Sequence, residues 1–246
     1  MFHPEGPTFA ELARQALSSV ERGYDLLAPK FDRTPYRTPD ALILPALAAV
    51  TRAERPVNDA LDLCCGTGAA LAHLRAFCLR ECVGVDLSAG MLRVAEATVN
   101  AAPGQARVRL VKADALDLPF ASRFDLITSF GAFGHILEAD EPRLAVSVAR
   151  ALRPGGRFVF VTAEAVSPLD PRALQARAFN ALMRVRNAVW DPPFVMYYLT
   201  FLVPRAREVL EAAGLRVRVL PGALPASLHP LVVVVAEKPD EPAQSA

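Results

Sequence analysis

A short apolar run that ends in a glycine turn constrains this chain more than any other stretch. Residues 60–70 read ALDLCCGTGAA, and an Ala/Leu-rich segment follows. This order predicts a strand, a tight turn and a helix, whose first amide groups can hold a ligand against the turn. About eighteen residues past the turn, a second apolar run, CVGV, ends at Asp86. An acid at that strand end suits a pair of ribose hydroxyls, so we expect a nucleoside-containing ligand across the two strand ends.

The motif is not the dinucleotide fingerprint G-x-G-x-x-G, because Leu71 occupies the third glycine position. With Asp62 inside the strand, it has the form hhDhxxGxG and resembles motif I of class I S-adenosylmethionine-dependent methyltransferases. Further matches follow in order, KADALDLPF at 112–120, FDLITSFGAFGHI at 124–136 and ALRPGGRFVF at 151–160. The resemblance covers roughly residues 57–162. Cys64 stands where the family commonly has its first glycine.

Strand and helix patterns alternate along the chain, which indicates right-handed βαβ units and a parallel sheet. We expect strands near 60–64, 82–86, 107–112, 124–129, 157–162, 215–220 and 231–236, and helices at 69–79, 89–100, 141–152 and 204–213. The resemblance implies an α/β, Rossmann-like fold with a seven-stranded, mostly parallel sheet. Its strand order would be 3-2-1-4-5-7-6, with the last strand antiparallel.

Two segments fall outside this alternation. Helical spacing over 8–31 and a second helix from Pro39 to about Glu54 precede the first strand, and the piece YDLLAPKFD resembles a lid segment of many small-molecule methyltransferases. Residues 165–203 interrupt the sheet pattern with an arginine-bearing helix over 171–189. We therefore divide the chain into an N-terminal helical lid (1–55), a cofactor-binding core (56–164), a substrate-lid insertion (165–203), the end of the core sheet (204–238) and a disordered tail (239–246).

The resemblance implies S-adenosyl-L-methionine as methyl donor and S-adenosyl-L-homocysteine as product. Asp86 would accept hydrogen bonds from the ribose, and Asp114, with Asp117 as a rival, from the adenine amino group. Met91 and Phe130 are equally well explained as core residues. The expected cofactor-binding residues are Asp62, Cys64, Gly66, Gly68, Asp86, Leu87, Met91, Asp114, Ala115, Ser129 and Phe130, with Tyr24 and Tyr36 covering the cofactor from the lid.

Methyl transfer from a sulfonium depends on positioning and, where the acceptor carries a proton, on a base. His135, just after the fourth strand, is the candidate base, with a structural histidine as the alternative; His229 is second. The candidate substrate residues are Trp190, Phe194, Tyr197, Tyr198 and His229, where the alternative is a self-packed lid. We expect no metal.

Composition limits the partners. A net charge of +1 gives no reason to expect nucleic-acid binding. No apolar run approaches the ~20 residues that span a bilayer, and no signal peptide is recognisable, so we expect no stable membrane insertion. The four cysteines lack metal-site spacing and suit reduced thiols in a cytoplasmic protein. A monomer or a homodimer is expected.

Three classes of function are compared, of which the sequence excludes one. The first is a methyltransferase for a small, apolar or aromatic acceptor, with O-methylation favoured over N- or C-methylation; the resemblance to ubiquinone/menaquinone-biosynthesis-type enzymes makes quinones and phenolics plausible acceptors. A short-chain dehydrogenase is excluded, because no tyrosine is followed four residues later by lysine. A non-catalytic module that binds S-adenosylmethionine is the third.

Overall fold

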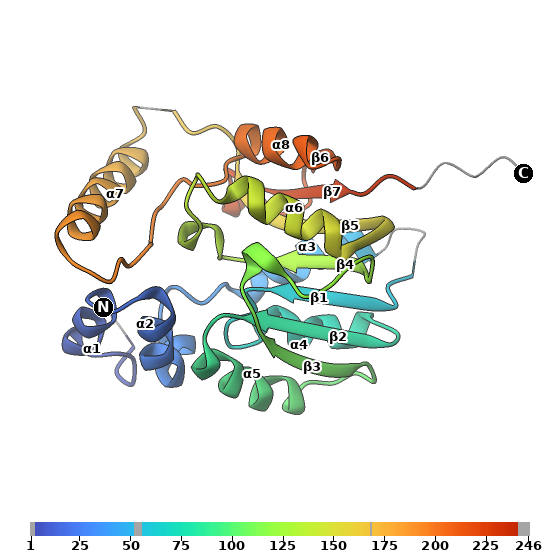
Figure 1. Cartoon of the computed structure of the whole chain (residues 1–246), viewed down its shortest axis with the longest axis horizontal. Coiled ribbons are helices and arrows are strands. Elements are labelled where there is room, and N and C mark those ends of the chain that lie inside the picture. The colour runs from blue at the N-terminus through green and yellow to red at the C-terminus, as the bar shows by residue number, and fades with distance from the viewer. Residues whose placement is uncertain (1–2, 52–55, 168, 241–246) are drawn as a thin grey trace, which may run out of the picture.

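A seven-stranded sheet forms the centre of the protein in a computed structural model, which describes residues 3–51, 56–167 and 169–240 (Figure 1). The strands are β1 (Asp59–Leu63), β2 (Glu81–Asp86), β3 (Arg107–Lys112), β4 (Phe124–Ser129), β5 (Leu152–Ala163), β6 (Arg216–Leu220) and β7 (Leu231–Glu237). Their order is β3-β2-β1-β4-β5-β7-β6, and β7 pairs antiparallel with both neighbours. This confirms the predicted fold class and strand order.

Helices cover both faces of the sheet. The core helices are α3 (Asp40–Thr51), α4 (Ala69–Phe77), α5 (Ala89–Ala101), α6 (Glu141–Ala151) and α8 (Val203–Ala212). Leu47, Leu71 and Val99 from α3, α4 and α5 share one apolar cluster with the sheet, while α6 and α8 contribute to the cluster on the other face. Alternate residues of each buried strand therefore enter different clusters, as the two-residue repeat of a strand requires.

The prediction of one helix over residues 8–31 is wrong, because the chain forms α1 (Phe9–Ala16), α2 (Val20–Leu27) and the short 3₁₀ helix η1 (Ala28–Arg33). Thr8 begins α1 with a capping box, and Ser19 begins α2 by accepting a hydrogen bond from the Arg22 amide. The serine cap thus starts a new helix although the apolar spacing continues. Helix α3 begins near the predicted Pro39, but its predicted end at Glu54 lies outside the described residues.

Within the insertion, helix α7 (Pro171–Val189) forms over the residues predicted to be helical. A return segment, residues 191–199, follows it. Two asparagines hold this return segment against α7. Asn180 exchanges two 2.8 Å hydrogen bonds with the backbone of Tyr198, and Asn187 bonds the backbone amide and carbonyl of Phe194 at 3.0 and 3.1 Å. The insertion is therefore a helix with an extended chain clamped along one side.

Short 3₁₀ helices complete the chain: η2 (Ala115–Asp117), η3 (Phe133–His135) and η4 (Ala226–Leu228). Figure 1 shows α1, α2 and α7 at the edge of the sheet where the parallel strands end. Ligands bind at this carboxyl edge in open α/β sheets.

Candidate active site

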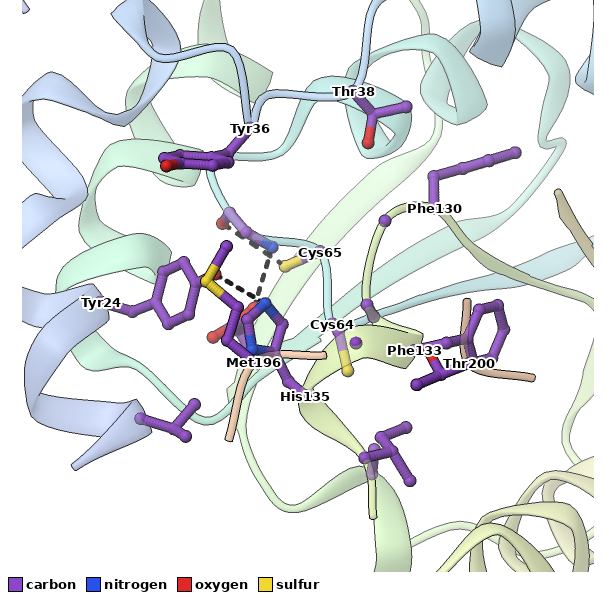
Figure 2. Close-up of a pocket in the computed structure, with 18 of the residues that line it drawn as sticks. Tyr24, Tyr36, Thr38, Cys64, Cys65, Phe130, Phe133, His135, Met196 and Thr200 are labelled. Carbon is purple, nitrogen blue, oxygen red and sulfur yellow. Dashed lines mark hydrogen bonds between the residues drawn. The ribbon is translucent and has the colours of Figure 1, made fainter. Parts of the chain in front are cut away.

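A cavity of about 840 Å³ lies at the carboxyl edge of the sheet. Its wall combines the glycine turn after β1, the ends of β2, β3 and β4, the segment from α2 to α3, and residues 195–200 of the insertion. Figure 2 shows labelled side chains from each of these regions except the ends of β2 and β3. The volume is in the range of small-molecule and cofactor sites.

The turn after β1 uses backbone conformations that favour glycine. Gly66 and Gly68 have φ of 52° and 85°, and Cys64 also lies in the left-handed region, with φ of 55°. The Cys65 amide donates to the Val85 carbonyl at 2.9 Å, which joins the turn to β2. Cys64 therefore adopts a backbone conformation that favours glycine, at a strain of about 1–2 kcal/mol for an L-residue.

The Asp86 carboxylate organises the turn from the end of β2. One oxygen accepts from the Gly66 amide and the other from the Ser88 amide, both at 2.9 Å. Burial raises the pKa of Asp86, and the hydrogen bonds from Ser88 and Gly66 oppose that rise. Each carboxylate oxygen keeps further acceptor capacity, so the group can also accept from a pair of ligand hydroxyls.

Asp62 is buried beneath the turn. Its carboxyl accepts from the Thr128 hydroxyl at 2.9 Å, and the two residues are register partners on β1 and β4. Burial raises the pKa of Asp62 to about 7, with the negative charge of Asp86 adding to the rise. Asp62 therefore titrates near neutral pH in this structure.

The N-terminal helices are bound to this turn and to α5. Asp25 on α2 accepts from the Ser88 hydroxyl at 2.6 Å and the Gly90 amide at 2.7 Å, where α5 begins. Thr67 in the turn donates to Asp32 of η1 at 2.6 Å. The N-terminal helices are thus attached through carboxylates to the starts of α4 and α5, and Tyr24 and Tyr36 lie on the cavity wall.

The ends of β3 and β4 complete this side of the cavity. Asp114 lines the cavity, and its carboxylate accepts from the Leu116 amide at 2.9 Å, which starts η2. Its rival Asp117 is absent from the cavity wall and pairs with Arg150 at 2.9 Å. Phe130 lines the wall after β4.

Tyr24 and His135 meet inside the cavity, as Figure 2 shows. The Tyr24 oxygen lies 2.7 Å from His135 Nε2, and His135 Nδ1 lies 2.8 Å from the Val195 carbonyl oxygen. Because a carbonyl only accepts, Nδ1 carries the proton and Nε2 accepts from the tyrosine hydroxyl. Burial lowers the pKa of His135, and burial, together with the charge of Asp86, raises the pKa of Tyr24. A neutral imidazole and a neutral phenol result.

The insertion reaches this pair through its backbone and through Phe194. The Tyr197 amide donates to the Gly134 carbonyl at 2.8 Å. A Cβ on Gly134 would lie only 2.6 Å from the backbone carbonyl oxygen of Tyr197. This close approach requires glycine beside His135. The buried Phe194 ring stacks on Tyr24 with 6.4 Å between centroids.

Most of the predicted site residues line the cavity: Asp62, Cys64, Gly66, Asp86, Leu87, Met91, Asp114, Ala115, Phe130, Tyr24, Tyr36, His135, Tyr197 and Tyr198. Five do not. Gly68 faces Ala95 of α5, since a Cβ on Gly68 would lie 3.2 Å from it, while Ser129 is buried in β4 and Phe194 stacks on Tyr24. Trp190 and His229 are exposed outside the cavity, whereas the insertion contributes residues 195–200 and Leu202 to the wall.

Sequence reasoning missed several residues that shape the site. No local sequence pattern predicts the long-range hydrogen bonds made by Asp25, Asp32 and the Val195 carbonyl. Thr128 could have been found, because a buried acid on β1 needs a donor and β4 is the adjacent strand.

Comparisons with known proteins agree with this geometry. Residues 60–156 match the family model described as "Methyltransferase domain". The chain carries a class I methyltransferase domain. A demethylmenaquinone methyltransferase of Symbiobacterium thermophilum is 32% identical over 171 residues, 68% of this chain and 59% of the relative. A 2-phytyl-1,4-naphthoquinone methyltransferase of Nostoc punctiforme is 31% identical over 140 residues, 56% of this chain and 60% of the relative.

The chain thus spans about six tenths of the length of these two relatives. Among solved structures, the DhpI complex with S-adenosylhomocysteine (SAH) has a TM-score of 0.64 at 19% identity, covering 95% of this chain and 100% of that chain. The methyltransferase domain therefore shares its fold with a protein that holds this product.

Two further findings concern the described part of the chain. Within it, no group of three or more His, Cys, Asp or Glu side chains is arranged to hold a metal ion. Across the same residues, no helix combines the length and apolarity needed to cross a membrane.

Proposed function

We propose that this protein uses S-adenosyl-L-methionine to methylate a small, apolar aromatic acceptor, with a quinol or phenol hydroxyl as the favoured group. One observation carries the proposal. A single cavity joins the glycine turn and Asp86 to the Tyr24–His135 pair, so a nucleoside site and a proton-accepting site share one space. The names of the two quinone-methylating relatives support the acceptor class.

The residues at the turn fit the cofactor. Asp86 presents two carboxylate oxygens anchored by backbone amides, which suits two ribose hydroxyls. A Cβ on Gly66 would meet nothing within 4 Å, so there is open space beside this backbone for a ligand. Asp114 and the Ala115 backbone lie at the edge of the same cavity for the adenine. When bound, S-adenosylmethionine supplies a methyl group that is already activated by a sulfonium.

The acceptor side supplies positioning and a proton route. Phe133, Met196 and Leu202 contribute apolar wall to the cavity beside His135. The acceptor hydroxyl donates to the Tyr24 oxygen, and the Tyr24 proton passes to His135 Nε2 as the acceptor oxygen becomes nucleophilic. Nδ1–H of the resulting imidazolium stays bonded to the Val195 carbonyl, which helps to stabilise the charge.

The same proton route serves methylation at a ring carbon, because removing a quinol proton also raises the electron density of the ring. Carbon methylation of a quinol is therefore the second candidate reaction.

The unpaired cysteines Cys64, Cys65, Cys78 and Cys82 support a reducing, cytoplasmic compartment as part of the proposal.

The test is transfer of an isotopically labelled methyl group to a panel of quinols, phenols and amines, followed by mass spectrometry and NMR of the product. A labelled methoxy group supports oxygen transfer, and a labelled ring methyl group supports the carbon alternative. Cofactor binding by calorimetry without transfer to any acceptor would instead favour a non-catalytic binding module. Transfer confined to amines would contradict the acceptor class.

A further inference from the structure

Helix α7 carries an apolar stripe on the side that faces solvent. Leu174, Leu182, Val185 and Val189 are 53%, 65%, 62% and 77% exposed. Their spacing places them along one side of the helix. The opposite side holds the return segment through Asn180 and Asn187. The stripe is therefore separate from the face that supports the cavity.

The charged residues of α7 are all positive. The sequence of this 19-residue helix contains arginines at 172, 177, 184 and 186 and no acidic residue, although Asp170 and Asp191 flank it. Arg184 lies over the Tyr197 ring at 5.7 Å, and Arg186 donates to the Pro192 carbonyl at 2.6 Å, so both contact the return segment. The side chains of Arg177 and Arg184 are exposed. Apolar residues bordered by arginines are typical of helices that lie in the interface of an anionic bilayer.

Trp190 follows directly after α7 and is 52% exposed. Sequence reasoning placed it in the substrate site, but it lies outside the cavity wall. A tryptophan has an apolar ring and one N–H donor, which suits the boundary between headgroups and acyl chains. It follows the last residue of the stripe, Val189, in the sequence.

The stripe is close to the site but is no part of it. Figure 1 shows α7 at the carboxyl edge of the sheet, beyond the helices α6 and α8 that cover the sheet itself. Among the described residues of the insertion, the cavity wall takes 195–200 and Leu202, and none from α7. A surface that covered the stripe would thus lie beside the insertion that closes the cavity.

We propose that α7 docks the protein on an anionic lipid bilayer, with Leu182, Val185 and Trp190 in the headgroup boundary. The apolar side chains supply burial, and the exposed Arg177 and Arg184 supply attraction to anionic headgroups. This inference goes beyond the proposed methyl transfer, and the lipid-binding test does not depend on that activity. Docking would give an apolar acceptor dissolved in the bilayer a short path to the cavity.

The experiment uses Trp190 as the reporter, because it is the one tryptophan of the chain. The full-length protein is mixed with vesicles of phosphatidylcholine alone or with 30% phosphatidylglycerol, at low and high salt. We expect a blue shift of the emission and co-sedimentation with the anionic vesicles, both weakened by salt. Unshifted emission with the protein left in the supernatant would overturn the proposal.

A variant pair tests the stripe. Leu182→Glu with Val185→Glu should lower the partition coefficient by about tenfold or more, since two buried apolar side chains become charged. Val146→Glu is the matched control, because Val146 is 59% exposed on α6, and its partition should stay unchanged. Leu182→Ser with Val185→Ser provides a milder second variant should the glutamates impair folding.

Two outcomes would assign the stripe differently. Equal loss of binding in the Val146 control would indicate non-specific adsorption. A wild-type dimer by light scattering that the double variant dissociates, with no vesicle binding, would assign the stripe to a second copy of the chain. Unchanged turnover of a water-soluble acceptor without vesicles would show that the double variant is folded, and it separates this proposal from the proposed function.

Discussion

The Tyr24 hydroxyl donates to Nε2 of His135 across 2.7 Å, although the two residues are 111 positions apart in the chain. This bond joins the N-terminal helices to the loop after β4, and the Val195 carbonyl on the other ring nitrogen joins the insertion to the same histidine. His135 thus connects both lid segments and lies on the cavity wall. Its replacement tests the chemistry and the closure of the site together.

We expect His135→Ala to lower kcat by about 10²–10⁴-fold, the usual contribution of a general base, with the cofactor Kd little changed. The base must be unprotonated, and burial lowers the pKa of His135 below its ordinary value of about 6.5. Wild-type activity should therefore hold at neutral pH and decline as the pH falls through that lowered value. A pH–rate profile measures this limb, which the variant should lack. A loss under about threefold with an unchanged profile would exclude His135 as the base.

Tyr24→Phe removes the hydroxyl that lies between the acceptor and His135 while keeping the ring stacked on Phe194. We expect kcat to fall by roughly 10–100-fold, because His135 retains its proton-accepting nitrogen but loses the relay. Steady-state kinetics and calorimetry separate this effect from cofactor affinity. Tyr36→Phe is the matched control on the same lid, and a similar kcat loss there would contradict the relay.

Asp86→Asn replaces a carboxylate that accepts from two backbone amides and would also bind the ribose. An amide side chain turns one accepting oxygen into a donor that faces the Gly66 or Ser88 N–H. Losing a charge-assisted hydrogen bond costs about 1.5–3 kcal/mol, so the cofactor Kd should rise about 10–100-fold. Calorimetry with S-adenosylhomocysteine measures it, with Asp117→Asn as the control. Equal Kd values for Asp86→Asn and wild type would refute the assignment.

The left-handed backbone of Cys64 predicts opposite effects for two substitutions. Cys64→Gly removes the side-chain clash of this conformation, worth about 1–2 kcal/mol, less the entropy that glycine adds to the unfolded chain. Cys64→Val puts a β-branched side chain in a conformation that such residues avoid and should destabilise the fold. Chemical denaturation should therefore rank glycine above valine by more than 1 kcal/mol. The reverse order would show that packing, and not backbone strain, decides this position.

The sequence supported the fold better than the site. Alternating strands and helices follow from apolar periodicity, while the strand order came from the resemblance around Asp62 and Asp86, because crossover connections do not encode it. The prediction of one helix over residues 8–31 was wrong, because Ser19 caps a new helix although the apolar spacing continues. Trp190 and His229 lie outside the cavity wall, because residue type does not say which way a loop turns. The contact of Tyr24 with His135 depends on tertiary packing alone.

The last prediction separates two of the aromatic residues that sequence analysis assigned to the acceptor, Tyr197 and Trp190. Tyr197 lines the cavity and its backbone bonds Gly134, whereas Trp190 is exposed outside the wall. Tyr197→Ala should raise the KM of a water-soluble acceptor about tenfold, since an apolar contact worth about 1.5 kcal/mol is lost, and leave the cofactor Kd unchanged. Trp190→Ala, measured without vesicles, should leave that KM within about twofold. If Trp190→Ala raised KM as much as Tyr197→Ala, the insertion would have to rearrange when the acceptor binds, bringing the end of α7 into the cavity.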